Sequence, residues 1–165
     1  MDFSTAPQFT RDMHPGEEDA VDALLRAAFP GPEEADLVRK LRKSRVIAGE
    51  SVMPMGDRII GYYALSHMVK PKGWLCLAPV AIHPDVQRRG YGKRMMGMLT
   101  EWARLTGTPV TVLGEPAFYE KAGFDRALAQ NLRTSYPIAY TMLAGVKKPP
   151  AAGTELVYPA AFDGL

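Results

Sequence analysis

The stretch Gln87-Arg88-Arg89-Gly90-Tyr91-Gly92-Lys93 separates an almost unbroken apolar segment from an amphipathic one. Residues 74–82 have the composition of a central strand that is buried on both faces, and residues 94–106 place apolar side chains at helical spacing. The two glycines of the loop allow a tight turn and a close backbone approach, and the first free N–H groups of the helix point toward a ligand there. This order of strand, loop and helix predicts an anion-binding site.

The basic residues of the loop indicate which anion it suits. Arg88, Arg89 and Lys93 supply positive charge, and guanidinium groups match phosphate oxygens, so a pyrophosphate fits better than a single carboxylate. The loop lacks the Lys-Ser or Lys-Thr of a Walker A motif and the third glycine of a Rossmann fingerprint. Taken alone, the stretch also fits a solvated turn with a capping glycine.

Amphipathic and alternating patterns divide the rest of the chain. Pro30-Gly31-Pro32 separates two amphipathic helices and forms a loop that we expect on the substrate side. Pro79 cannot donate to a sheet ladder, so it predicts a bulge or a local splaying of strands within residues 74–82. The expected helices are residues 17–28, 33–43, 94–106 and 116–122, and the expected strands are residues 46–51, 58–68, 74–82, 110–113, 136–143 and 156–158.

The third of these helices has a predicted core face. Met95, Met98, Leu99 and Trp102 recur at helical spacing and are expected to face the core, and Gly107 is expected to end the helix. The methionines of this segment are more typical of core filling than of a functional surface.

Composition predicts an ordinary globular protein. The chain has 165 residues, of which 47% are hydrophobic and 23% charged, with a net charge of +2. We expect a single domain over residues 1–165, with residues 1–9 as a flexible or loosely packed lead-in. Weak net charge argues against a nucleic-acid partner, and no apolar run is long enough to span a membrane. The single cysteine, Cys76, lies in an apolar strand and, with no export signal, favours a cytoplasmic location.

Gln87, Gly90 and Gly92 reproduce motif A of the GNAT acetyltransferases, and residues 77–84 resemble the fourth strand of that family and the turn after it. The resemblance implies an α+β fold of three layers, with a mixed, twisted central sheet flanked by helices. In the family, the fourth strand carries a bulge and splays from its neighbour, which agrees with Pro79. The sequence of residues 113–119 and the C-terminal segment with Gly153, Tyr158, Pro159 and Phe162 also resemble a subgroup of uncharacterised bacterial predicted acetyltransferases.

The resemblance implies acetyl-CoA as the cosubstrate and no metal. The pantetheine arm would bind the backbone of Val80 and Ile82, and the pyrophosphate would bind the amides of residues 88–93. The complete set that the resemblance assigns to the cofactor is Val80, Ala81, Ile82, Gln87, Arg88, Arg89, Gly90, Tyr91, Gly92 and Lys93.

Residues 117–124 are similar to motif B of the family, in which a tyrosine precedes a Gly-Phe pair. Tyr119 occupies that place and is expected to act as the general acid that protonates the departing thiolate. A free phenol has a pKa near ~10, so it is protonated at neutral pH. Alternatively, Tyr119 only packs beside Phe118 and Phe124.

No general base stands out in the sequence. The candidates are Glu50, His67, His83 and Glu115. His67 follows a strand and is expected to face a cleft, although such a histidine is often structural. Many family members carry asparagine near Glu115, and a glutamate there also suits a helix cap.

The resemblance implies an N-acetyltransferase in which an acceptor amine attacks the thioester directly. We expect a small-molecule or peptide amine as the acceptor, at a site formed in part by the loop at 30–32 and by residues 131–137. The expected oligomeric state is a monomer or a homodimer. The alternatives are a non-catalytic acyl-CoA-binding or regulatory module and a phosphate-anchored nucleotide-binding domain. Selective binding of acetyl-CoA and measurable transfer would separate these three classes.

Overall fold

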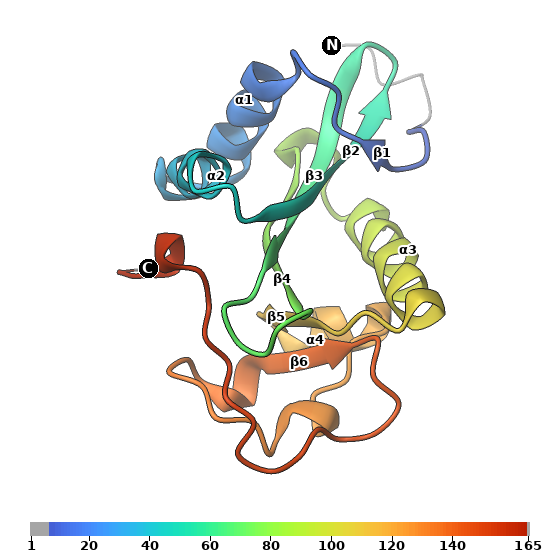
Figure 1. Cartoon of the computed structure of the whole chain (residues 1–165). Helices are drawn as coiled ribbons and strands as arrows, with labels where there is room; N and C mark the ends of the chain where they lie inside the picture. The colour runs from blue at the N-terminus through green and yellow to red at the C-terminus, as the bar shows by residue number, and fades with distance from the viewer. Residues whose placement is uncertain (1–6, 165) are drawn as a thin grey trace.

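A computed structural model describes residues 7–164 as a twisted six-stranded sheet with the strands in sequence order (Figure 1). Neighbouring strands are antiparallel except for β4 and β5, which are parallel, so the sheet is mixed as predicted. Most of the expected lead-in, residues 1–6, lies outside the described residues. The strands are β1 (Arg11–Asp12), β2 (Ile47–Met55), β3 (Arg58–His67), β4 (Leu75–Ile82), β5 (Val110–Leu113) and β6 (Thr141–Ala144).

Helices cover both faces of the sheet, which gives the predicted three layers. Helices α1 (Glu18–Ala28) and α2 (Glu33–Lys43) lie on one face, and α3 (Tyr91–Thr106) lies on the other (Figure 1). The apolar stripe of α1 packs on buried strand residues such as Tyr62, and the stripe of α3 packs on residues such as Ile60. The short helix α4 (Pro116–Tyr119) follows β5.

The predicted irregularity in β4 is confirmed at Pro79. Tyr63 of β3 pairs with Val80 and Leu65 pairs with Leu77, so two residues of β4, Ala78 and Pro79, oppose a single residue of β3. An extra residue reverses the alternation of side chains along a strand. Leu77 before the bulge and Val80 after it therefore pack against the same core, on the face covered by α3.

Strands β4 and β5 splay apart, as the resemblance implied. Among the described residues they pair only at Leu75 with Val110 and at Cys76 with Thr111, although both strands continue beyond these pairs. The unpaired halves form the two arms of a V. This opening exposes backbone groups of β4 that a closed sheet would hold in its ladder.

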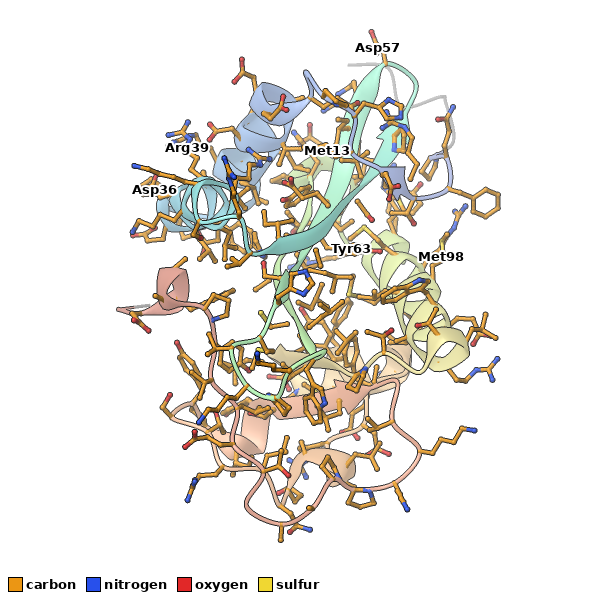
Figure 2. All side chains as sticks on the ribbon, in the orientation of Figure 1. Met13, Asp36, Arg39, Asp57, Tyr63 and Met98 are labelled. Carbon is orange, nitrogen blue, oxygen red and sulfur yellow. The ribbon has the colours of Figure 1, made fainter. Side chains whose placement is uncertain are left out.

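The third helix exists and ends where it was predicted to end, but its predicted core face was partly wrong. Its core face includes Met95, Met96 and Leu99, whereas Met98 and Trp102 are 37% and 41% exposed. Methionines at 95, 96 and 98 make two overlapping helical stripes apolar, and packing on the sheet buries Met96 and leaves Met98 exposed. The Thr10 hydroxyl lies 3.3 Å from Sδ of Met98, on the side of α3 that faces the segment leading into β1 (Figure 2).

Several predicted boundaries also needed correction. Helix α3 begins at Tyr91 rather than at residue 94, because Gly90 with φ of 84° is its cap. Residues 156–158 do not form a strand, since only Val157 makes an isolated bridge, with Lys70. Strand β2 continues to Met55, beyond the predicted end at residue 51.

Cys76 is buried as expected, and burial raises the pKa of its thiol to about 12, which disfavours a nucleophilic role.

Candidate active site

A cavity of ≈ 410 Å³ lies between the end of β4, the loop after it, the first turn of α3 and α4. We call it the loop cavity. It brings together all the residues predicted to bind the cofactor except Ala81 and Arg89, and it adds Val86, Phe118 and Tyr119. Its lining consists of Val80, Ile82, Val86, Gln87, Arg88, Gly90, Tyr91, Gly92, Lys93, Phe118 and Tyr119.

Ala81 does not face the loop cavity. Its side chain is 3% exposed and belongs to the core under α1, together with Val21 and Tyr62. The alternation along β4 causes this, because Val80 and Ile82 on either side face α3. Ala81 is therefore limited to backbone contacts with a ligand in the loop cavity. Arg89 is also absent from the lining of the cavity.

The loop backbone has the special conformation that its glycine predicted. Gly90 has φ of 84° and Arg88 has φ of 65°, both in the left-handed region. The side-chain amide of Gln87 donates to the carbonyl oxygen of Ile82 at 2.9 Å, which fastens the loop to the end of β4. The loop leads directly into the first turn of α3, whose N–H groups lack intrahelical acceptors. An anion at this helix end meets both these groups and the positive end of the helix dipole.

Tyr119 lines the loop cavity. Its ring makes edge contacts with Phe118 and Phe124, with centroid separations of 4.9 and 5.7 Å. Burial raises the pKa of Tyr119 above its ordinary value, so the phenol is protonated at neutral pH. Gly114 lies against this ring so closely that a Cβ at position 114 would overlap it. The position of the ring therefore depends on a residue without a side chain.

A second cavity of ≈ 440 Å³ opens between the splayed arms of β4 and β5, α2 and the C-terminal segment. We call it the aromatic cavity. Val80 and Tyr119 line both cavities, so the two meet at these side chains. The lining consists of Phe29, Glu34, Leu37, Leu77, Ala78, Pro79, Val80, Thr111, Leu113, Tyr119, Tyr136, Tyr158 and Phe162.

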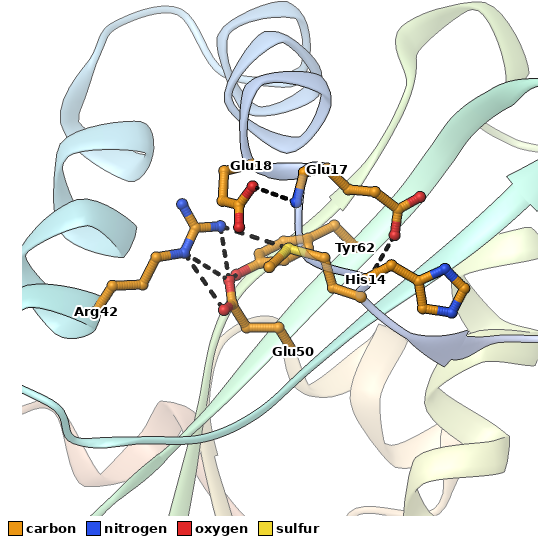
Figure 3. Close-up of polar contacts among 8 residues, drawn as sticks. His14, Glu17, Glu18, Arg42, Glu50 and Tyr62 are labelled. Carbon is orange, nitrogen blue, oxygen red and sulfur yellow. Dashed lines mark hydrogen bonds and ion pairs between the residues drawn. The ribbon is translucent and has the colours of Figure 1, made fainter.

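Glu50 belongs to a polar cluster between α2 and the sheet (Figure 3). Nη2 of Arg42 lies 2.8 Å from Oε1 of Glu50, and the hydroxyl of Tyr62 donates to the same Oε1 at 2.5 Å. Burial and this carboxylate raise the pKa of Tyr62 far above its ordinary value. The cluster fastens α2 to β2 and β3, and Glu50 lines neither cavity.

The other base candidates also lie outside the two cavities. His67 is exposed at the end of β3 and lines a separate groove with Trp102 of α3. Nδ1 of His83 accepts from the N–H of Asp85 at 3.2 Å, within a turn that precedes the loop. Glu115 caps α4 by accepting from the N–H of Ala117 at 3.5 Å, which is the alternative role that the sequence offered.

Glu34 is the carboxylate that sequence reasoning missed. It follows the loop at residues 30–32, which was expected on the substrate side, and it lines the aromatic cavity. Acidic residues are common in the first turn of a helix because they interact favourably with the helix dipole, so the sequence alone gave no reason to select Glu34.

Across residues 7–164, no group of three or more His, Cys, Asp or Glu side chains is arranged to hold a metal ion.

Comparison with known proteins identifies the family. The model of the acetyltransferase (GNAT) domain matches residues 43–126, which contain the bulged strand, the loop and Tyr119. The uncharacterized N-acetyltransferase YhbS of Escherichia coli strain K12 is 30% identical over 132 residues, covering 74% of this chain and 77% of that protein. The chain therefore belongs to the GNAT superfamily of acetyltransferases.

Solved structures agree with the fold. The crystal structure of the GNAT family N-acetyltransferase YhbS from Escherichia coli in complex with CoA superposes with a TM-score of 0.85 at 24% identity, covering 98% of this chain and 94% of that one. A GNAT family acetyltransferase from Brucella melitensis in complex with acetyl-CoA gives 0.78 at 23% identity, covering 96% and 99%. In the described part of this chain, no helix combines the length and apolar character needed to cross a membrane.

Proposed function

We propose that this protein transfers an acetyl group from acetyl-CoA to an amine, with the cofactor in the loop cavity and the acceptor in the aromatic cavity. The observation that carries the proposal is the meeting of the two cavities at Val80 and Tyr119. A thioester delivered from one side and an amine delivered from the other would come together beside the phenol. Such an arrangement uses proximity and orientation, which lower the barrier of a bimolecular step.

The loop cavity fits coenzyme A in its chemistry. Its basic side chains include Arg88 and Lys93, and the positive φ at Gly90 directs the chain into the start of α3, where N–H groups are free to bind phosphate oxygens. The solved relatives named above hold CoA or acetyl-CoA. Val80 and Ile82 lie on the arm of β4 that does not pair with β5, and their backbone groups would hydrogen-bond to the pantetheine arm.

Acetyl-CoA supplies an activated thioester when bound. The neutral amine attacks its carbonyl carbon, a C–N bond forms, the C–S bond breaks and the electron pair leaves with sulfur. Tyr119 donates its phenolic proton to that sulfur, and a proton released from the new amide nitrogen returns to the phenolate through solvent. The ammonium form of the acceptor first loses one proton to solvent, because none of the four base candidates lies in either cavity.

The first test measures binding and turnover separately. Calorimetric titration should show acetyl-CoA binding with no binding of ATP or NAD, and release of free thiol should report transfer to an amine. Tyr119→Phe is expected to reduce turnover about 100-fold, in the range for loss of a general acid, with an unchanged Kd for acetyl-CoA. Because burial raises the pKa of Tyr119, turnover should not fall through ionisation of this phenol below a pH of about 10.

Tyr140→Phe is the matched control, since Tyr140 is 49% exposed and lines neither cavity. It should leave turnover and binding unchanged. Unchanged turnover in Tyr119→Phe would remove Tyr119 from the mechanism. Acetyl-CoA binding without thiol release for any amine would instead support the non-catalytic acyl-CoA-binding module.

A further inference from the structure

The aromatic cavity has walls that suit an apolar body. Tyr136 and Tyr158 make an edge contact at 5.1 Å, Tyr158 and Phe162 make another at 5.7 Å, and Phe29 closes the side next to α2. The hydroxyl of Tyr136 donates to the carbonyl oxygen of Phe162 at 3.2 Å, which holds the C-terminal segment in this wall. A volume of ≈ 440 Å³ is suited to a small molecule rather than to a folded partner.

Glu34 is the only side chain with a formal charge at neutral pH among those that line the aromatic cavity. Within residues 7–164 its carboxylate has no hydrogen bond or ion pair. The nearby Asp22 differs, since Arg39 lies 2.8 Å from its carboxylate. A half-buried carboxylate with no cationic partner, beside aromatic rings, is a suitable site for an ammonium group.

Two hydroxyls give the cavity a second polar feature. Thr111 is completely buried and the hydroxyl of Tyr158 is buried. Among the described residues, neither oxygen has a hydrogen-bond partner. Burial raises the pKa of Tyr158 to about 12, and the neighbouring Thr111 hydroxyl acts in the opposite direction. Buried hydroxyls without partners are costly, so a ligand that hydrogen-bonds to them gains affinity.

From these features we infer that the acceptor is a small monoamine on an aromatic frame, with its ammonium group held by Glu34 and a hydroxyl on the frame bonded to Thr111 and Tyr158. This inference rests on the proposed function and names the substrate class of the same site. Glu34 is a binding and positioning residue in this scheme. It holds the ammonium form of the acceptor, which loses one proton to solvent before the neutral amine attacks the thioester.

The same chemistry disfavours other acceptors. A free amino acid brings a carboxylate, which Glu34 repels, and no cationic side chain lines the cavity to balance it. A polyamine brings extra positive charges that the aromatic walls would desolvate without partners. The cavity therefore selects against charge at any point of the acceptor except the reacting amine.

The test compares three probes, tyramine, phenethylamine and tyrosine, by release of free thiol from acetyl-CoA. Tyramine differs from tyrosine by one carboxylate and from phenethylamine by one hydroxyl. We expect kcat/KM for tyramine to exceed that for tyrosine by at least about tenfold. Glu34→Gln should raise the KM for tyramine about tenfold, as expected for loss of one charge-assisted hydrogen bond. It should also lower the ratio of kcat/KM for tyramine to kcat/KM for tyrosine.

Glu33→Gln is the matched control, because Glu33 lies in the same helical turn, is exposed and does not line the cavity. It should change neither KM nor the preference. Thr111→Val keeps the size of the side chain and removes the hydroxyl. It should abolish the preference for tyramine over phenethylamine, because kcat/KM for tyramine falls toward that for phenethylamine.

An equal or greater activity with tyrosine would overturn the inference, and so would an unchanged tyramine KM in Glu34→Gln. Acetylation of a lysine peptide or spermidine without acetylation of tyramine would also overturn it and would leave the proposed function standing. Failure to bind acetyl-CoA would instead contradict the proposed function itself, so the two failures are distinguishable.

Discussion

The two cavities that meet at Tyr119 are built in different ways. The loop cavity is formed almost entirely by residues 80–93, one continuous stretch of strand, loop and helix. The aromatic cavity takes its walls from parts of the chain as far apart as Phe29, Thr111 and Phe162. Backbone conformation dominates the first, and side chains from several elements dominate the second.

This difference separates what the family shares from what is particular to this chain. A phosphate held by backbone N–H groups requires a local conformation, and a local conformation leaves a local sequence pattern. A cavity lined by side chains requires only that distant elements pack in the right place. The same loop cavity can therefore accompany many acceptor cavities.

The largest expected effect tests the local nature of the loop cavity. Gly90→Val should weaken acetyl-CoA binding at least about 100-fold, because a β-branched residue does not adopt a φ of 84° and the loop must change its course. Gly73→Val is the matched control, since Gly73 has φ of 86° and a Cβ there also meets no atom within 4 Å. Calorimetric titration of both variants measures the difference.

Both variants should lose stability to a similar degree, of order 1–3 kcal/mol for a strained backbone. Only Gly90→Val should lose the cofactor. Equal acetyl-CoA affinity in the two variants would show that the loop does not hold the cofactor.

The next effect tests how far the aromatic cavity depends on packing between elements. Glu50→Gln breaks the ion pair with Arg42 and weakens the bond from Tyr62, which together fasten α2 to the sheet. We expect the free energy of unfolding in urea to fall by about 2 kcal/mol, less than for a fully buried pair because Arg42 is 24% exposed. Acetyl-CoA affinity should not change, whereas the KM of the amine should rise, since α2 carries Glu34.

Glu101→Gln is the control, because the ion pair of Glu101 with Arg104 is exposed on α3. Its stability should change little. A loss of acetyl-CoA affinity in folded Glu50→Gln would contradict the independence of the two cavities.

The smallest effect concerns the side chain that the cavities share. Gly114→Ala should reduce turnover about tenfold, because a Cβ would overlap the Tyr119 ring and displace it from its place between the cavities. Acetyl-CoA affinity should fall less than turnover. Gly97→Ala, at a helical position where a Cβ meets no atom within 4 Å, provides the comparison in the same thiol-release assay.

Unchanged turnover in Gly114→Ala would mean that the ring tolerates the added methyl group. The position of Tyr119 would then matter less than the presence of its hydroxyl, which Tyr119→Phe tests directly.

Much of the fold was predictable because its signals are local. Pro79 cannot donate a backbone hydrogen bond, so it indicated the bulge, and Gly107, with φ of 67°, marked the end of α3. The core face of α3 was predicted less well. Met98 and Met96 are equally apolar in the sequence, and only contact with the sheet buries one of them and leaves the other exposed.

The candidate base residues show the same limit. A carboxylate such as Glu50 or Glu115 carries no sequence signal that distinguishes an ion pair, a helix cap and a site in a cavity. The structure assigned Glu50 to an ion pair and Glu115 to a cap, and it placed Glu34 in the aromatic cavity.

The sequence by itself determined the strand, the loop and the helix that form the loop cavity, because glycine, proline and helix-end geometry act over a few neighbouring residues. Only the tertiary structure decided that Ala81 faces away from that cavity and that Glu34, Thr111 and Tyr158 share another. Their meeting depends on the splay of β4 and β5 and on the return of the C-terminal segment. These are long-range contacts, and no short stretch of sequence specifies them.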